Sequence, residues 1–459
     1  MKPTRASVCR KTHAAVELRF EQAADLTSFA GLHVFARLFA TVDLKTRLRR
    51  CFAHAGISPI YGHATVVSVL LVGLLLGYRR LRDLDYYRDD PMVARTLGLR
   101  RLPDVATVSR TLASCDVRSV AKLGRLVGEL TLDRLTELGL SRVTLDFDGT
   151  VVSTGRRAEG SAVGYNRNKK GRRSYYPLVC TVAQTGQVLA VLHRAGNVHD
   201  SNGAEALIEA SIERVRERLP GAVIEVRMDG AFFGQALIAR LEELGVEYSI
   251  SVPFERLSEL KETIERRALW ESAGEDRAYF EARHRPKSWK ISPRFVVVRS
   301  SVTVRNKGPV QLDLFEPQER GYEFKVIVTN KELTAPRLTR YHEGRGSQEA
   351  VFAELKTNCQ MDHVPTRRLA GNQIYMLCAV LAHNLGRELQ MRTRPPDRRT
   401  GAKRTALWKL ATMETLRRTI VQRAGRLVSP KGQLTLVMSA NESVRTEIVG
   451  YLDALDRAA

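Results

Sequence analysis

The sequence contains few cysteines, and none of them is spaced as a metal-binding or redox pair. The six cysteines are scattered without a CxxC motif: Cys9, Cys51, Cys115, Cys180, Cys359 and Cys378. This pattern argues against a zinc ribbon and against a disulfide framework. It fits a reducing compartment, and we expect a cytoplasmic, nucleoid-associated protein.

Long hydrophobic runs are also missing. The longest run, Val66 to Leu76, is too short to cross a bilayer and predicts a buried helix. Residues 1–10 hold no apolar stretch of the kind found in signal peptides. There is no internal repeat and no long low-complexity tract. A membrane partner is therefore not expected.

Acidic residues are scarce relative to basic ones. The 459 residues include 73 Lys and Arg against 50 Asp and Glu, which gives a formal net charge of +23. An excess of this size indicates a polyanionic partner, most often nucleic acid, with a membrane surface as the weaker alternative. The length allows roughly two to four domains.

Residues 1–140 predict a helical N-terminal region that binds DNA. Leu32 to Phe52 has helical periodicity, with cations on the polar side. Within residues 91–114, a short helix, a turn at Gly98 and a second helix after Pro103 are similar to a helix-turn-helix. Any small helical bundle offers such a pair, so a purely structural role is the alternative.

At residue 142 the periodicity changes from helical to alternating, and residues 141–252 are expected to form the first part of the core. Val143, Leu145 and Phe147 share one face of a predicted strand, and Asp146 and Asp148 lie on the other. The elements that follow are a hairpin at 178–193, a helix at 203–218, a strand at 222–228, a helix at 233–244 and a strand at 246–252. This order predicts a mixed sheet with parallel strands on one side. If the fourth strand lies beside the first, Asp148 and Asp229 sit at the same end of neighbouring strands.

Residues 253–330 break the alternation and predict an inserted, largely β subdomain. Residues 331–390 return to the core, with a helix around Glu349 and a long apolar helix at 371–385 that we expect to be buried against the sheet. Residues 391–459 form a basic C-terminal region.

The stretch from Tyr341 to Lys356 predicts the start of a helix with Ser347 as its N-cap. Helical spacing puts Glu349 and Lys356 on one side, and Arg345 lies just upstream. A carboxylate flanked by two cations suits a place where a metal ion and a nucleic-acid phosphate meet. A solvated helix with ordinary ion pairs is the alternative.

Asp148, Asp229 and Glu349 are the candidate metal ligands and catalytic residues. Three carboxylates that face one point repel one another unless a cation neutralises them. Oxygen ligands without histidine or cysteine favour Mg²⁺ or Mn²⁺, and two such ions can catalyse phosphodiester displacement. Asp146 is a competing first ligand, but Asp148 lies nearer the strand end. Each aspartate alone has an alternative role as a turn residue or helix cap.

Several short segments, taken together, resemble a known family. They are Leu145–Thr150, Gly164–Asn166, Tyr176–Leu178, Arg194–Asn197, Arg227–Gly230, Tyr341–Lys356 and Ala379–Leu385. This set resembles the bacterial insertion-sequence transposases of the DDE class, closest to the insertion-sequence family numbered thirteen-eighty, which is related to the one numbered four. The resemblance covers roughly residues 60 to 450. It implies an α/β fold with a ribonuclease H-like mixed five-stranded sheet, helices on both faces, a β-rich insertion and an all-α N-terminal DNA-binding region.

The resemblance also assigns roles to residues. Its two aspartates and one glutamate match Asp148, Asp229 and Glu349. Its Tyr, Arg, Glu, Lys signature matches Arg345, Glu349 and Lys356 in spacing, whereas Tyr341 stands one residue further upstream. Arg345 and Lys356 would hold phosphates, with Tyr341 as a third candidate. The loop from Arg156 to Arg173 would contact the DNA backbone, and the alternative for it is a run of solvated charges. Its cations are Arg156, Arg157, Arg167, Lys169, Lys170, Arg172 and Arg173.

By the same resemblance, the enzyme binds inverted-repeat DNA ends as a homodimer, cleaves them and joins the 3′-ends to target DNA. Trp289 is the candidate for stacking on a flipped base, and a partly buried aromatic is the alternative for it. Two other functions stay open. One is a non-transposing nuclease or resolvase on the same core, and the other is a DNA-binding protein without catalysis.

Overall fold

The computed structural model describes most of the chain. The described residues are 18, 24–56, 60–155, 157–164, 166, 169–199, 202–274, 276–287, 289–301, 322–397 and 407–457. Among the helices of these residues, none combines the length and apolar character needed to cross a membrane.

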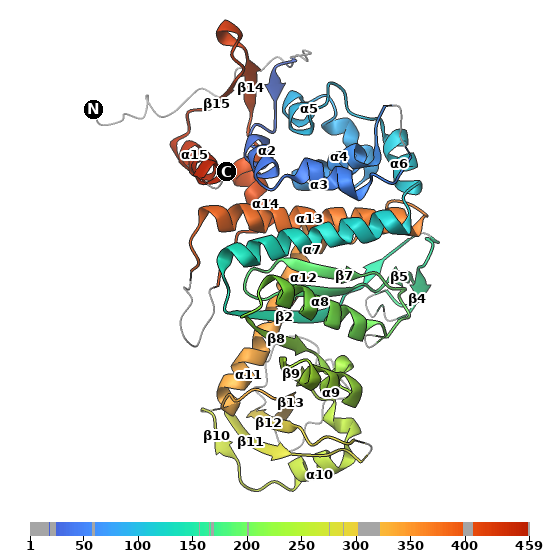
Figure 1. Cartoon of the computed structure of the whole chain (residues 1–459), viewed down its shortest axis with the longest axis vertical. Helices are drawn as coiled ribbons and strands as arrows, with labels where there is room; N and C mark the ends of the chain where they lie inside the picture. The colour runs from blue at the N-terminus through green and yellow to red at the C-terminus, as the bar shows by residue number, and fades with distance from the viewer. Residues whose placement is uncertain are drawn as a thin grey trace, which may run out of the picture.

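A nine-stranded mixed sheet forms the centre of the fold, in the order β10-β11-β12-β13-β9-β8-β2-β6-β7 (Figure 1). The strands are β2 (Arg142–Gly149), β6 (Leu178–Val182), β7 (Val188–Leu192), β8 (Val223–Met228), β9 (Glu247–Ser251), β10 (Glu271–Ser272), β11 (Arg277–Arg283), β12 (Arg294–Ser301) and β13 (Tyr322–Thr329). The mixed sheet expected from the sequence is thus confirmed.

The first and fourth predicted strands are neighbours, as expected. β2 runs parallel to β8, and the last aligned pair of residues is Phe147 with Met228. Asp148 and Asp229 each follow one member of this pair. Since neighbouring strands lie about 4.8 Å apart, the two aspartates share one end of the sheet.

The expected five-stranded sheet is present only as part of a larger one. Its strands occupy the contiguous positions β9-β8-β2-β6-β7, but β13 pairs with the free edge of β9 through Ile327 and Ser251. Strands β10–β13 therefore extend the core sheet and do not form a separate β sheet of their own. An unpaired edge exposes backbone donors and acceptors, and the inserted strands satisfy them. The domain boundaries drawn from the sequence stay a prediction.

Helices cover both faces of the sheet. On one face, the buried side chains of α8 (Ala204–Arg218) and α9 (Gln235–Glu243) belong to the same hydrophobic core as Leu145 and Phe147 of β2. On the other face lie α11 (Ala335–Glu343) and α12 (Ser347–Thr357), and Gln348 of α12 donates a hydrogen bond to the Asp146 carbonyl of β2. The polar face of β2 is therefore buried as well.

Two long helices join the sheet to the N-terminal helices. α7 (Val117–Leu138) and the buried α13 (Leu369–Thr393) lie side by side above the sheet in Figure 1. Asn384 of α13 bonds both the amide and the carbonyl of Val188 in β7. The predicted buried helix against the sheet is confirmed.

The N-terminal region is mainly helical. Its helices are α2 (Leu32–Thr41), α3 (Leu44–Cys51), α4 (His63–Leu76), α5 (Pro91–Leu97), α6 (Val105–Ala113) and the 3₁₀ turn η1 (Leu81–Tyr86). It is not all-α, because β1 (Leu26–Thr27) pairs with β14 (Gly425–Val428), and β14 pairs with β15 (Thr435–Met438). The apolar run forms α4, which is buried as predicted.

The two helices of the expected helix-turn-helix are present as α5 and α6. Gly98 adopts the left-handed conformation after α5, and Asp104 caps α6 by accepting from the Thr107 amide. However, α5 ends at Leu97 and α6 begins only at Val105, so the connection exceeds the usual turn of about three to four residues. The DNA-reading role of this pair stays a prediction.

The remaining elements are short or C-terminal. A small sheet of β3 (Val152–Ser153), β5 (Arg173–Tyr175) and β4 (Ala162–Val163) stands beside the main sheet. The chain ends with α14 (Met413–Leu416) and α15 (Glu442–Arg457), and α10 (Ser258–Glu265) precedes β10.

Candidate active site

Asp148 lies at the end of β2, and its carboxylate pairs with Arg345. The Arg345 Nη1 to Asp148 Oδ2 distance is 3.0 Å, and the side chains are 21% and 20% exposed. Arg345 belongs to η4 (Gly344–Gly346), the turn between α11 and α12. The structure therefore brings together two of the predicted site residues that are far apart in the sequence.

Asp229 follows β8 and also caps a short turn. Its Oδ1 accepts the Ala231 amide at 3.0 Å, at the start of the 3₁₀ turn η2 (Gly230–Phe232). The capping role considered for this residue is thus real. It does not exclude a ligand role, because a carboxylate has several acceptor positions.

Glu349 lies in the first turn of α12 and is exposed. The predicted N-cap at Ser347 is wrong: Ser347 is already helical, and its hydroxyl donates to the Gly344 carbonyl at 2.9 Å. The reason is that α11 and η4 run directly into α12, so no free helix end needs a cap there. Gln348 anchors this turn to the sheet, with 3.0 Å between its Nε2 and the Asp146 carbonyl.

Within the described residues, no group of three or more His, Cys, Asp or Glu side chains is arranged to hold a metal ion. Asp148 and Asp229 end neighbouring strands, but in this conformation Glu349 does not close a three-ligand cluster with them. The donor set still fits a hard divalent ion in kind, since all three ligands are carboxylates. The gathering of all three around an ion stays a prediction.

The carboxylate of Asp146, the competing first ligand, is already paired with an arginine. Its carboxylate is buried and receives two hydrogen bonds from Arg227, at 2.6 Å from Nε and 2.7 Å from Nη2. A carboxylate paired on both oxygens with a buried guanidinium is not free to bind an ion. This contact favours Asp148 over Asp146 as the first acidic residue.

Tyr341 is half-buried. Two cations lie near its ring, with Arg227 at 5.1 Å and Lys331 at 4.5 Å from the ring centroid, and its hydroxyl is buried. The phosphate-binding role predicted for Tyr341 stays a prediction. The position of Tyr341 instead supports Arg227.

His342 attaches α11 to β9. Its ring nitrogens lie 3.0 and 2.8 Å from the Ser249 and Ser251 hydroxyls. Burial, aided by the nearby cations Lys325, Arg345 and Arg227, lowers the pKa of His342 to about 3. The imidazole is therefore neutral at physiological pH and acts as a hydrogen-bonding group.

Two lysines stand near the acidic residues. Burial lowers the pKa of Lys356, while the charges of Asp362 and Asp148 oppose that shift. Burial likewise lowers the pKa of Lys325 on β13, with Glu343 opposing and Arg345 reinforcing the shift. The structure thus places the predicted Lys356 near Asp148 and adds Lys325 as a cation that the sequence pattern did not mark.

The predicted basic loop is described in part, because Arg156 and Arg167 lie outside the described residues. The cations that are exposed are Arg157, Lys169, Lys170, Arg172 and Arg173. Arg173 donates to the Ser161 hydroxyl and carbonyl, so it also holds the loop together. The other four are exposed cations on the same loop.

Trp289 is half-buried and stacks on Phe233, with 5.0 Å between ring centroids and 28° between ring planes. One face of the indole is therefore already covered by Phe233, which is itself half-buried and packs against the core. This contact agrees with the alternative of a partly buried aromatic, and base stacking by Trp289 stays a prediction.

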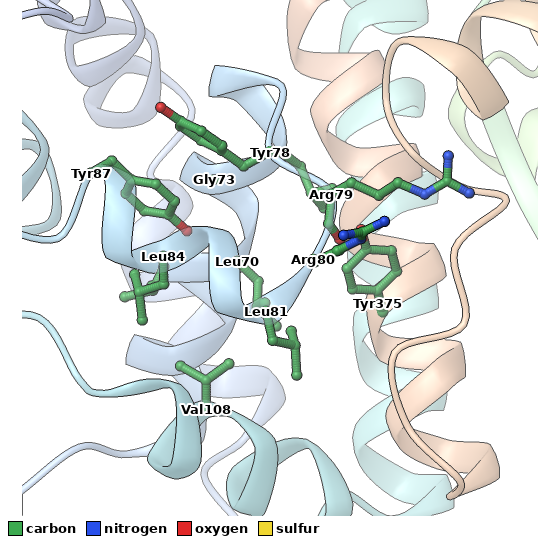
Figure 2. Close-up of a pocket in the computed structure, with 12 residues that line it drawn as sticks. Leu70, Gly73, Tyr78, Arg79, Arg80, Leu81, Leu84, Tyr87, Val108 and Tyr375 are labelled. Carbon is green, nitrogen blue, oxygen red and sulfur yellow. The ribbon is translucent and has the colours of Figure 1, made fainter.

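A small pocket lies away from these residues. Figure 2 shows it among α4, η1, α6 and Tyr375 of α13. Tyr375 donates to the Arg79 carbonyl at 2.7 Å. The Tyr87 hydroxyl comes within 2.3 Å of where a Cβ at Gly73 would stand, which explains the glycine inside an apolar helix. The pocket is a gap in helix packing and has no part in the candidate site.

A buried ionic cluster fixes α12 from its other end. Glu354 accepts a hydrogen bond from Arg387 at 2.5 Å and from the Met413 amide at 2.9 Å, and the His383 imidazole lies 3.7 Å away. Burial disfavours the charge on Glu354, but His383, Arg387 and the Met413 amide outweigh it and lower its pKa to about 2. This cluster connects α12 to α13 and α14.

Comparison with known proteins gives the family. The family model described as Transposase DDE domain group 1 matches residues 9–459. The chain belongs to this family of DDE transposases. No curated protein matches it.

Two solved transposase structures resemble the transposase described here only distantly. The piggyBac transposase synaptic complex with hairpin DNA is 12% identical, with a TM-score of 0.43, over 85% of this chain and 79% of that one. The Mos1 transposase paired-end complex with the left transposon end is 14% identical, with a TM-score of 0.18, over 42% and 60% of the two chains. The family model is what assigns the transposase to its class.

Sequence reasoning missed three residues around the site of this transposase. Arg227 lies in the quoted Arg227–Gly230 segment, and Gln348 stands next to Glu349, yet neither received a role. Lys325 sits in a strand whose pairing with β9 was not foreseen. The one signal available in the sequence was Arg227, an arginine at an inward strand position two residues before the candidate Asp229.

Proposed function

We propose that this transposase binds the double-stranded ends of its element, cleaves them and joins the 3′-ends to target DNA. Asp148, Asp229 and Glu349 are the acidic residues of this reaction. The observation that carries the proposal is the parallel pairing of β2 and β8, which puts Asp148 and Asp229 at one end of the sheet. Gln348 attaches the turn with Glu349 to the same strand.

In this proposal, the three carboxylates hold Mg²⁺ or Mn²⁺, two ions in the full site. Such ions supply an activated water or 3′-hydroxyl and offset the charge that develops on the leaving oxygen. Arg345 and Lys356 orient the phosphates, with Arg345 able to form two parallel hydrogen bonds and Lys356 acting as a point charge. The net charge of +23 supplies the general attraction to DNA.

The terminal inverted repeats, the target DNA and a second copy of the chain are the partners of the reaction. The basic surface of Arg157, Lys169, Lys170 and Arg172 contacts the backbone, and α5 with α6 contacts the repeat. A non-transposing nuclease is the second candidate, since it would need the same acidic residues. It would cut DNA with and without the element's ends equally well.

The test is Asp148→Ala with a matched control, Asp89→Ala, whose side chain is 91% exposed on an N-terminal loop. The substrate is DNA that carries the inverted repeats flanking the gene. We expect D148A to lose cleavage while it keeps its affinity for the ends, and D89A to behave like the wild type. Unchanged cleavage by D148A would remove the site assignment, and cleavage independent of the repeats would favour the non-transposing nuclease.

A further inference from the structure

The Arg227 side chain lies between the two strands that carry the candidate aspartates. Arg227 of β8 and Asp146 of β2 are aligned partners in the parallel pair, and their side chains are 6% and 1% exposed. Both oxygens of Asp146 accept from the guanidinium. Each member of this ion pair stands two residues before an aspartate of the site, Asp148 on one strand and Asp229 on the other.

The same guanidinium also reaches the third element. Its Nη1 donates to the Tyr341 carbonyl of α11 at 2.7 Å. A Cβ at Gly344, in the turn that carries Arg345, would stand 2.5 Å from that nitrogen. Hence Gly344 allows the turn to approach Arg227 closely.

The backbone of Asp146 contacts the fourth element, α12. Its carbonyl accepts from Gln348, the residue before Glu349. One buried ion pair therefore contacts β2, β8, α11 and α12, which together carry all the acidic candidates.

Only arginine has the donors for this position. Its planar guanidinium can serve both Asp146 oxygens and, in a third direction, the Tyr341 carbonyl. A lysine ammonium at the same place has three donors on a single nitrogen, so it cannot keep the hydrogen bonds to both Asp146 oxygens and to the Tyr341 carbonyl.

We infer that Arg227 is a positioning residue that sets the placement of Asp148, Asp229 and the start of α12 relative to one another. This inference rests on the proposed function. Arg227 itself is buried and does not touch DNA; it acts through the backbone of the three elements.

The test compares Arg227→Lys with Arg134→Lys. Arg134 forms the same kind of buried, two-bond pair, with Glu388, and the side chains are 6% and 8% exposed. That pair joins α7 to α13, away from the acidic residues. Both variants lose a buried guanidinium, so a general loss of stability affects both.

We expect the two variants to melt at similar, lowered temperatures and to bind end-containing DNA like the wild type. Well below the melting temperature, R227K should lose about 100-fold in kcat, the order of effect that a misplacement of about 1 Å produces. R134K should stay within about threefold of the wild type. Equal kcat values for R227K and R134K would overturn the inference while leaving the proposed function intact.

A second measurement does not depend on cleavage. Hydrogen exchange should become faster in R227K at residues 146–149, 228–231 and 343–349 together, and in R134K at none of them. Asp146→Asn keeps the side-chain shape and should show the same exchange pattern with a smaller loss of kcat, which covers the case that R227K does not fold. Unchanged exchange at these three segments would contradict the inference. Absence of cleavage by the wild type on end-containing DNA would overturn the proposed function and this inference with it.

Discussion

Glu354→Gln should make the unfolding free energy less dependent on pH in the acid range, because Glu354 is a buried carboxylate with a lowered pKa. Its side chain is 5% exposed, and it faces Arg387 and His383 on α13 and the Met413 amide. Since the pKa in the folded protein is about 2 against an ordinary 4.5, the folded state prefers the ionised form. This preference stabilises the protein at every pH above the ordinary value.

The size of the effect follows from the shift. A lowering of about 2.5 pKa units corresponds to about 3 kcal/mol at neutral pH. The contribution is complete above about pH 5 and is lost as the pH falls toward 2. About 1.4 kcal/mol of it should already be gone at pH 3.5.

The assay is urea unfolding of the full chain, followed by tryptophan fluorescence at pH 7, 5, 4 and 3.5. The difference between wild type and E354Q should be about 3 kcal/mol at pH 7 and at pH 5, and should shrink at the two lower values. Glu349→Gln is the matched control, because Glu349 is exposed on the same helix and its replacement should change stability by less than about 0.5 kcal/mol. A difference that stays constant down to pH 3.5, or one near zero at pH 7, would refute this reasoning.

Two further predictions concern the basic loop and a close backbone contact. The first variant neutralises the four exposed loop cations Arg157, Lys169, Lys170 and Arg172. It should lower the slope of log affinity against log salt concentration by roughly three to four, as measured by filter binding. An unchanged slope would exclude this loop as a DNA contact. Gly196→Ala should destabilise the protein by about 1–3 kcal/mol, because a Cβ there would stand 2.3 Å from the Ser174 hydroxyl and 2.6 Å from its carbonyl. Gly155→Ala, at a position with open space around it, is the control, and equal unfolding midpoints for the two variants would contradict the contact.

Local patterns predicted the elements near the site well. Alternation along β2 and the order of strands and helices predicted that Asp148 and Asp229 share one sheet end, since parallel pairing follows from that order. The apolar helix at α13 and the buried helix at α4 were likewise evident from composition alone.

Contacts between distant segments were not predictable in this way. The pairing of β13 with β9 depends on which edge is free after the core has formed. The pairing of Arg227 with Asp146 and the position of Tyr341 beside it depend on how α11 crosses β2 and β8. The prediction of Ser347 as an N-cap was wrong for a similar reason, because the helical turn that follows α11 continues into α12 and takes the place of a cap. Helix signals are local, whereas these outcomes are set by packing.

The most direct test of the account is to locate the divalent ion within the protein. Iron(II) would replace Mg²⁺ in the transposase bound to its DNA ends, and ascorbate with peroxide would then generate radicals that cut the backbone next to the ion. We predict cuts after β2, after β8 and at the start of α12 in one sample, near Asp148, Asp229 and Glu349, and their loss in D148A. Cuts that omit the start of α12, or that persist in D148A, would contradict a shared site of these three carboxylates.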